Sequence, residues 1–405
     1  MTDKNTLKTV LYAQAVYDDE EIAAVVDVLK NDAVALMNGR RVKEFERRVA
    51  DKFGKAHGHM VNSGSSANML ATAMLRLEPG DEIITPALTF STTVAPLVQN
   101  RLVPVFVDVE PDTYNINVDA IEEMIGPKTR AMMIPNLIGN IPDWRKLRSI
   151  GDKNGLTLIE DSCDTVGYTL DNRTTGKLSD ITTTSFYASH VITAAGFGGM
   201  VMVNDDQLSD QANLLRGWGR TSSRKQESES MDDRFHSEVD GIAYDDKFVF
   251  EDIGYNFLPS EISAAFGLVQ LGRLEAYAQI RKTNFKAMVN FFEAYSNWFI
   301  LPSQLDEVDT AWLAVALIIR DDAPFSRRDL QVFFEGCGIQ TRTVFTGNIL
   351  RQPGYKDIER REAAGGFPNA DQVMRGGILI GCHQGMSAED TDYMQSRFLE
   401  FAKQY

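Results

Sequence analysis

The sequence contains little cysteine. Only Cys163, Cys337 and Cys382 occur among 405 residues, and no two of them form a CxxC pair. An odd and sparse set of cysteines argues against a disulfide framework and is typical of a reducing compartment. We therefore expect the protein to work in the cytoplasm.

Long apolar runs and basic runs are also missing. No apolar run approaches the ~20 residues that a membrane-spanning helix needs, and residues 1–10 lack the apolar segment of a signal peptide. The formal net charge is -16. Without a basic run, this charge argues against nucleic acid or an anionic membrane as the partner, although a small anionic ligand can still be held locally.

What the sequence does contain, between about residues 57 and 204, is an alternation of short apolar runs and helical patterns. Strands buried on both faces have near-continuous apolar sequences, so the pattern predicts an α/β fold with a mostly parallel, doubly wound sheet. Ligands of such sheets bind at the carboxyl ends of the strands, where we expect the functional residues. The runs that predict strands are 81–85, 103–109, 131–137, 156–161 and 182–187.

The pattern changes after this region. Residues 221–248 are rich in serine and charged residues, which indicates either a long mobile loop or lid, or a solvated insertion. Regular spacing then resumes, and we expect two domains, residues 1–270 and residues 271–405. The later predicted elements are helices at 260–268, 273–295, 327–335 and from 387, and strands at 311–319 and 377–380.

A run of small residues follows a short predicted strand and opens a helix at Gly64, Ser65 and Ser66. Free N–H groups and the positive end of the helix dipole attract anions, so this run can cradle a phosphate. The alternative is a serine-rich helix cap with a purely structural role.

Two carboxylates follow the apolar strand at 156–159. Asp161 and Asp164 therefore lie at a strand's carboxyl end, beside the crevice of the sheet. An aspartate that faces a pyridine nitrogen keeps that nitrogen protonated and makes the ring an electron sink. Helix capping or a surface turn is the alternative.

The third element begins at Ser185, reaches His190 and continues through a glycine-rich run, 196–199, into an apolar strand. In their order and separations, the three elements resemble the DegT/DnrJ/EryC/StrS sugar aminotransferase family of fold-type I pyridoxal phosphate enzymes. The resemblance extends over about residues 10–400. It implies an aspartate aminotransferase-like fold with a small α+β C-terminal domain, and pyridoxal phosphate or pyridoxamine phosphate as the cofactor.

His190 departs from the usual family motif. In the family a lysine ends this motif and binds the cofactor covalently, whereas here no lysine occurs between Ser185 and Asp205. An imidazole cannot form that bond, but it can carry protons near neutral pH. In having a histidine at this position, the sequence resembles the 3-dehydratase branch of the family, whose members deoxygenate nucleotide-linked 4-keto-6-deoxy sugars. The resemblance implies that His190 is catalytic and that L-glutamate regenerates pyridoxamine phosphate.

The resemblance also implies roles for other residues. Asn256 reaches into the site from a neighbouring subunit, which implies a homodimer with shared active sites. For Phe90 considered alone, core packing is the alternative. The remaining roles are phosphate binding by Gly64, Ser65 and Ser185, stacking on the pyridine ring by Phe90, binding of the ring nitrogen by Asp161, and a place near the ring substituents for Asp164.

One type within the branch carries an iron-sulfur cluster on four cysteines and takes electrons from a reductase. Cluster ligation needs four thiolates, and only Cys163 matches a ligand position. We therefore expect no cluster, no metal site and no reductase partner. The likeness is then to the type that finishes by hydrolysis, with a GDP-linked sugar as the first expectation and a CDP-linked sugar as the next.

Several residues are candidates for contact with the substrate. Arg220 and Arg342 can grip a diphosphate or a carboxylate through bidentate hydrogen bonds, with a surface salt bridge as the alternative. His383 lies in a run that is similar to the hydrolytic type. Phe197 and Leu313 replace the glutamate and phenylalanine usual in the family, and both lie near the expected substrate position.

The expected reaction is therefore 3-deoxygenation of a nucleotide-linked 4-keto-6-deoxy sugar. Two alternatives remain open: a transamination whose product keeps the nitrogen, with the histidine only as proton carrier, and a non-catalytic relative that binds the cofactor or sugar without turnover.

Overall fold

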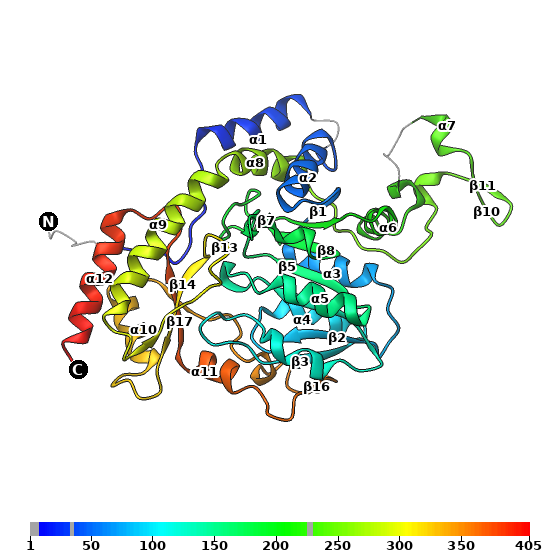
Figure 1. Cartoon of the computed structure of the whole chain (residues 1–405). Helices are drawn as coiled ribbons and strands as arrows, with labels where there is room; N and C mark the ends of the chain where they lie inside the picture. The colour runs from blue at the N-terminus through cyan, green and yellow to red at the C-terminus, as the bar shows by residue number, and fades with distance from the viewer. Residues whose placement is uncertain (1–7, 33–35, 225–229) are drawn as a thin grey trace.

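The computed structural model describes residues 8–32, 36–224 and 230–405. A large sheet of eight strands lies at the centre of this described chain, with helices on both faces (Figure 1). Neighbouring strands are parallel except at β9, which is antiparallel to both its neighbours. The spatial order is β1 (His57–Val61), β9 (Gly199–Val203), β8 (Ile181–Ser185), β5 (Thr157–Ser162), β4 (Thr129–Pro135), β2 (Glu82–Pro86), β3 (Val103–Val107) and β16 (Arg361–Glu362).

Successive strand residues face opposite sides of this sheet and build two apolar layers. Ile83 packs into one layer and Ile84 into the other. Burial on both faces explains the near-continuous apolar sequence of the strands. The helices of the first face are α3 (Gly64–Met74), α4 (Ser91–Gln99) and α6 (Asp206–Arg216), and those of the second are α2 (Arg40–Phe53), α5 (Trp144–Asn154) and α8 (Glu261–Gly272).

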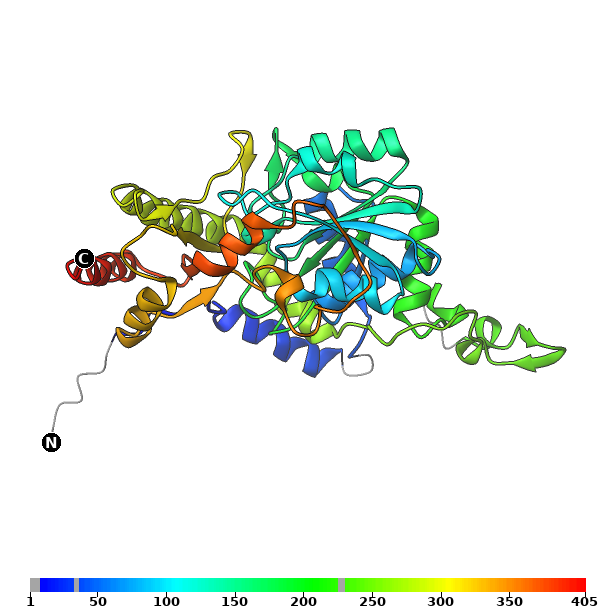
Figure 2. The same ribbon diagram turned by 90° about the horizontal axis from the view of Figure 1, so that it is seen from below.

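A smaller antiparallel sheet is built from the C-terminal part of the chain, and Figure 2 shows it beside the large one. Aromatic side chains such as Phe292, Phe334 and Phe398 form the core between this sheet and its helices. The elements are β12 (Phe299–Ile300), β14 (Ala314–Ile319), β17 (Gly377–Gly381) and β15 (Thr341–Thr343), with α9 (Leu274–Glu293), α10 (Arg327–Gly336) and α12 (Ala388–Ala402).

Segments from each end of the chain pack with the sheet that is built mainly from the other end. β16 comes from the C-terminal part of the chain but pairs with β3 of the large sheet, and Val10 bridges to Ile339 beside the small sheet. The division at residue 270 therefore stays a prediction. The remaining elements are α1 (Asp19–Asn31), α11 (Pro368–Gly376), β6 (Thr169–Leu170), β7 (Arg173–Thr174), β13 (Val308–Asp309), η1 (Val118–Ala120), η2 (Glu122–Met124), η3 (Leu137–Gly139), η4 (Thr175–Lys177) and η7 (Ile349–Arg351).

The charged segment 221–248 contains short regular elements, where the sequence predicts a loop or a solvated insertion. Figures 1 and 2 show it as an arm that projects from the body. Polar contacts within the arm, such as the ion pair of Arg234 with Asp245, hold its parts together. The spacing of apolar residues in the sequence does not reveal such polar contacts. Residues 225–229 lie outside the described residues. The elements are η5 (Thr221–Arg224), α7 (Met231–Arg234), the hairpin of β10 (Ser237–Val239) and β11 (Ile242–Tyr244), and η6 (Asp246–Phe248).

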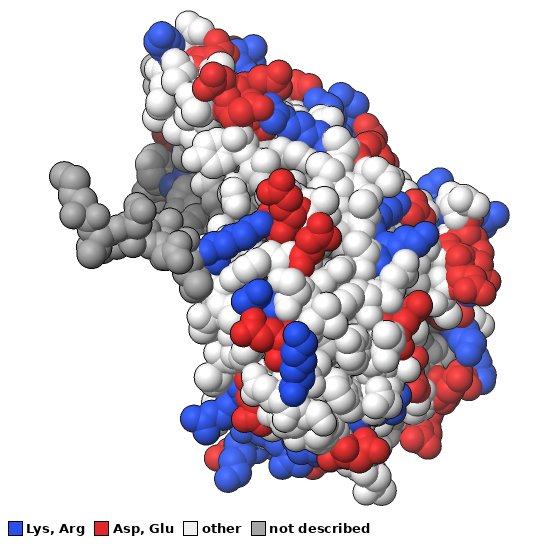
Figure 3. Space-filling model, turned by 90° about the vertical axis from the view of Figure 1, so that its left-hand side faces the viewer, with Lys and Arg blue, Asp and Glu red and all other residues white. Residues whose placement is uncertain are grey.

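The predicted α/β architecture is confirmed. The five apolar runs form β2, β3, β4, β5 and β8, and the later predicted helices form α8, α9, α10 and α12. On the face drawn in Figure 3, basic and acidic side chains of the described residues are intermixed, without a continuous basic patch. No helix in the described ranges is both long enough and apolar enough to cross a membrane.

Candidate active site

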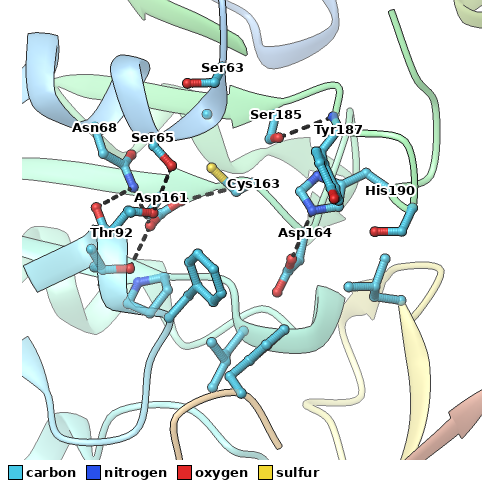
Figure 4. Close-up of a pocket in the computed structure, with 18 of the residues that line it drawn as sticks. Ser63, Ser65, Asn68, Thr92, Asp161, Cys163, Asp164, Ser185, Tyr187 and His190 are labelled. Atoms are coloured by element: carbon cyan, nitrogen blue, oxygen red, sulfur yellow. Dashed lines mark hydrogen bonds and ion pairs between the residues drawn. The ribbon is translucent and has the colours of Figure 1, made fainter. Parts of the chain in front are cut away.

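A cavity of about 360 Å³ lies at the carboxyl ends of β4, β5 and β8 (Figure 4). Parallel strands end at the same edge of a sheet, which brings residues that are distant in the sequence together there. The predicted catalytic and cofactor-binding residues that line the cavity are Gly64, Ser65, Phe90, Asp161, Asp164, Ser185 and His190.

The N-terminus of α3 opens directly at this cavity. Ser63 caps the helix, because its Oγ accepts a hydrogen bond from the backbone N–H of Ser66 at 3.1 Å. A Cβ on Gly64 would lie only 2.6 Å from the Cβ of Ser185. Glycine therefore lets the helix end approach the Ser185 hydroxyl, which leaves helical N–H groups and a hydroxyl side by side for an anion.

Substituting Gly64 by alanine should weaken phosphate and cofactor binding. Overpacking of this kind costs about 1–3 kcal/mol, which corresponds to a loss in affinity of about tenfold or more. Titration of the variant with pyridoxal phosphate, followed by absorbance, measures the effect. Gly272→Ala is the matched control, because a Cβ at that glycine meets nothing within 4 Å. Equal affinity in the two variants would contradict the cradle.

Asp161 is held rigidly at the end of β5 with a carboxylate edge on the cavity. Its Oδ2 accepts hydrogen bonds from Asn68 Nδ2 and from Thr93 Oγ1, each at 2.8 Å. Its Oδ1 accepts one from the backbone N–H of Cys163 at 3.2 Å. These three hydrogen bonds fix the orientation of the carboxylate at the edge of the cavity.

His190 lies on the side of the cavity away from Ser65 and Asp161, as Figure 4 shows. Its Nε2 is 4.0 Å from Oδ1 of Asp164, and its Nδ1 is buried without a hydrogen-bond partner in the described chain. Burial lowers the pKa of His190 to about 4; the backbone of Ser185 opposes this shift, and the charge of Arg281 adds a smaller lowering effect. The imidazole is therefore neutral near pH 7 and can accept a proton.

Asp164 has the opposite shift. Burial raises its pKa to about 7, although the backbone N–H of Ile138 donates to Oδ2 at 2.9 Å and opposes the rise. Opposite shifts in neighbouring acids and bases are typical of catalytic sites.

Aromatic side chains form the apolar wall of the cavity. Phe90 is 51% exposed although it adjoins buried structure, and its ring meets that of Phe345 edge to face at 6.0 Å. The ring of Tyr187 lies 5.9 Å from His190 and 5.8 Å from Phe197. An uncovered Phe90 ring offers a stacking surface, which disfavours the core-packing alternative.

Some lining residues were not expected from the sequence. Asn68 lies one helical turn after Gly64, and that spacing alone places it on the same helix face. Tyr12 and Phe345 arrive from distant parts of the chain, and no sequence pattern signals them. The lining residues outside the sequence-based set are Tyr12, Ser63, Asn68, Thr92, Thr93, Pro135, Leu137, Cys163, Tyr187, Ser189, Gly198 and Phe345. Phe197 and Leu313, noted for replacing the usual family residues, line the cavity as well.

Four predicted site residues do not line this cavity. Asn256 pairs with Gly217 in a short bridge. His383 is buried, with Nε2 facing the carbonyl of Leu11 at 3.1 Å and Nδ1 accepting the N–H of Gly385 at 3.2 Å. Because the backbone engages both nitrogens of His383, its placement does not support substrate binding in this chain.

The two arginines pack against aromatic rings. The guanidinium of Arg220 lies over Trp218 at 4.2 Å, and that of Arg342 lies over Tyr12 at 5.3 Å. Neither guanidinium has a carboxylate oxygen of the described residues within 4.0 Å. Arg342 adjoins the cavity only through Tyr12, which is a lining residue.

The three cysteines lie in different parts of the fold. Cys163 lines the cavity, Cys382 is buried at the end of the small sheet, and Cys337 caps α10. No group of three or more potential ligands is arranged around a metal position in the described part of the chain.

Comparison with known proteins identifies the class. The model of the DegT/DnrJ/EryC1/StrS aminotransferase family matches residues 16–398, and the chain belongs to this family. It has the fold of fold-type I pyridoxal phosphate enzymes, and the predicted aspartate aminotransferase-like architecture is confirmed. The protein is a sugar-modifying pyridoxal phosphate enzyme.

Individual relatives narrow the comparison. The chain is 36% identical to dTDP-4-dehydro-2,6-dideoxy-D-glucose 3-dehydratase of Saccharopolyspora spinosa, over 96% of this chain and 85% of that protein. It is 30% identical to GDP-4-keto-6-deoxy-D-mannose 3-dehydratase of Escherichia coli O55:H7, over 95% of this chain and 97% of that protein. A solved GDP-4-keto-6-deoxymannose-3-dehydratase with a trapped PLP-glutamate geminal diamine superimposes with a TM-score of 0.86 at 29% identity, over 96% of this chain and all of that one.

The residues present fit pyridoxal phosphate. A Cβ on Gly64 would collide with Ser185, so glycine is what brings the N-terminus of α3 next to the Ser185 hydroxyl, an arrangement that suits a phosphate. Asp161 presents a fixed carboxylate for the ring nitrogen, and Phe90 offers an exposed ring for stacking. Nδ1 of His190 is a buried polar atom to which no described residue is hydrogen-bonded.

Proposed function

We propose that this protein is a 3-dehydratase of a nucleotide-linked 4-keto-6-deoxy sugar that uses pyridoxamine phosphate and takes its amino group from L-glutamate. The observation that carries the proposal is His190: a neutral imidazole lines the cavity, and no lysine of the described residues lines it. Without a lysine, the protein has no side-chain amine there to hold and release the cofactor covalently.

In this proposal, Gly64, Ser65 and Ser185 hold the phosphate, Asp161 holds the ring nitrogen and Phe90 covers the ring face. Bound pyridoxamine phosphate supplies an amine for the sugar's keto group and a ring that delocalises negative charge. His190 accepts the proton that leaves the cofactor's reactive carbon, while the hydroxyl on sugar carbon 3 departs. The nearby Asp164 carboxylate, 4.0 Å from Nε2, stabilises the imidazolium that results.

The balance of the reaction follows from the product. Loss of the hydroxyl leaves an unsaturated amino sugar, and its hydrolysis releases ammonia and the 4-keto-3,6-dideoxy sugar. Glutamate then restores the amine form of the cofactor and leaves as 2-oxoglutarate.

The test is incubation of the cofactor-loaded enzyme with glutamate and 4-keto-6-deoxy sugars linked to GDP, CDP or dTDP, followed by product mass. A product that has lost one oxygen and holds no added nitrogen supports the proposal. A product that keeps the nitrogen supports transamination instead, the activity in the family's own name. The dTDP-linked sugar belongs in the panel because a 36% identical relative is named for one.

The non-catalytic alternative has its own signature. Glutamate added to the protein loaded with pyridoxal phosphate should change the cofactor's absorbance as the amine form accumulates. An unchanged spectrum, with cofactor binding intact, would point to a binding protein without turnover.

The predicted homodimer belongs to the same proposal. Asn256 does not reach the cavity of its own chain, while apolar side chains nearby are exposed, Ile253 by 94% and Phe250 by 55%. Such exposure is typical of a surface that another protein covers. Asn256 then contributes to the cofactor site of a second copy, and a cytoplasmic location remains predicted.

Mixing two inactive variants should restore activity. His190→Ala and Asn256→Ala each damage one side of a shared site, so a mixed dimer holds one site in which both residues are intact. We expect each variant alone to be strongly impaired and the mixture, after subunit exchange, to recover up to about a quarter of the wild-type turnover, as random pairing into C₂ dimers implies. Light scattering measures the mass. A monomer, or no recovery after proven exchange, would contradict the shared site.

A further inference from the structure

A buried guanidinium lies close to the loop that carries His190. Arg281, on α9, is 0% exposed. Its Nε donates to Gln384 Oε1 at 2.8 Å and its Nη1 to the carbonyl of Leu313 at 3.0 Å, while Nη2 is buried and has no hydrogen-bond partner in the described part of the chain. Among the described residues, none of its nitrogens has a carboxylate oxygen within 4.0 Å. Buried arginines are normally paired, so this uncompensated charge needs a physical account.

Both hydrogen bonds of Arg281 lead to the active site. Leu313 lines the cavity. Gln384 is itself buried, and its Nε2 donates to the carbonyl of Val191 at 3.1 Å. Val191 directly follows His190, so a continuous chain of two hydrogen bonds connects α9 to the backbone of the proposed proton acceptor.

Burial and the charge of Arg281 act on the imidazole in the same direction. A positive charge disfavours a second positive charge nearby, and both effects lower the pKa of His190. The backbone of Ser185 opposes both effects and raises the pKa of His190. The titratable and charged groups around the pair are Asp164, Tyr12, Tyr187 and Cys163 near His190, and Tyr12, Tyr168 and Cys382 near Arg281.

We propose that Arg281 is a positioning residue for His190: through Gln384 it fixes the backbone that follows the imidazole, and its charge, which no carboxylate of the described residues offsets, adds to the effect of burial on that imidazole. The proposal rests on the proposed role of His190. The proposal gives a reason for burying an arginine without a counter-charge. If Arg281 were paired with a carboxylate, its charge would be offset and it would repel a proton on His190 less strongly.

Arg281→Met is the first test, because it removes the charge and keeps an unbranched side chain. Titration of histidine-labelled, cofactor-free protein by NMR reports the pKa of His190 directly, and the His190→Ala spectrum identifies its signal among the five histidines. We expect the His190 pKa to rise by about one unit in Arg281→Met. The acid limb of kcat/KM should move to higher pH by the same amount.

Arg281→Lys is the matched control. It retains the charge but cannot reproduce the two directed hydrogen bonds of the guanidinium. We expect the His190 pKa to stay within about 0.3 units of the wild-type value, while kcat falls because the backbone at Val191 is no longer held. A role confined to folding stability would instead leave both the pKa and the pH profile unchanged in every folded variant.

Gln384→Glu provides a second route if Arg281→Met does not fold. The new carboxylate pairs with Arg281 and neutralises its charge, so the His190 pKa should again rise. An unmoved His190 pKa in the folded variants overturns the inference. Because this titration needs neither cofactor nor substrate, it gives the same answer whether the enzyme deoxygenates or transaminates, and product mass separately decides the proposed function.

Discussion

Replacing His190 with alanine should reduce the turnover of deoxygenation by about 10²–10⁴-fold, the usual contribution of one general base. The imidazole lines the cavity and is neutral near pH 7, so it is the side chain that can take the proton from the cofactor's reactive carbon. Stopped-flow measurement of deoxygenation by enzyme preloaded with pyridoxamine phosphate isolates this step. Cofactor affinity, titrated separately, should change little.

His190→Lys is the informative partner variant. A lysine at this position can bind the cofactor covalently and can release an aminated product. We expect the absorbance of a covalently held cofactor, a gain of aminotransferase turnover with glutamate, and loss of deoxygenation. Unchanged deoxygenation in His190→Ala would refute the role assigned to His190. Loss of both activities in His190→Lys would show that the residues around position 190 also decide between deoxygenation and transamination.

Asp161→Asn should lower kcat by about 10²–10³-fold, as expected when one preorganised electrostatic contact is removed from an active site. Its carboxylate accepts hydrogen bonds from Asn68, Thr93 and the backbone of Cys163. In Asp161→Asn one carboxylate oxygen becomes an NH₂ donor that faces other hydrogen-bond donors. The neutral amide also no longer favours a protonated ring nitrogen. Steady-state kinetics and the cofactor's absorbance measure the two consequences.

Thr93→Val is the control for this prediction. It removes one donor to Asp161 but keeps the carboxylate, and a single hydrogen bond of this kind contributes about 1.5–3 kcal/mol. We expect a smaller loss of activity than in Asp161→Asn, with the cofactor's spectrum closer to that of the wild type. If the two variants behave alike, orientation of the carboxylate matters more than its charge.

Much of the site follows from local sequence rules. Gly64, Asp161 and Ser185 each lie where a strand ends or a helix begins, and parallel strands bring those ends to one edge of the sheet. Their convergence was therefore predictable once the strands were recognised by their apolar runs. The exchange of lysine for His190 is likewise visible in the sequence.

Other parts of the site depended on the packing of distant segments. Tyr12 reaches the cavity because Val10, two residues earlier, bridges to Ile339 beside the small sheet, and Leu313 and Phe345 come from the C-terminal part of the chain. The same packing keeps His383 away from the cavity and leaves Asn256 outside it. Local spacing cannot signal such contacts, since they depend on how two sheets meet.

The sequence by itself determined the family, the cofactor class and the residue that replaces the family lysine, because these depend on the order and identity of short motifs. Only the tertiary structure decided the protonation state of His190, the opposite shift of Asp164 and the position of Arg281 behind the catalytic loop. The physical reason is that desolvation and the effect of a buried charge depend on which groups surround a side chain, and those neighbours are set by the fold as a whole.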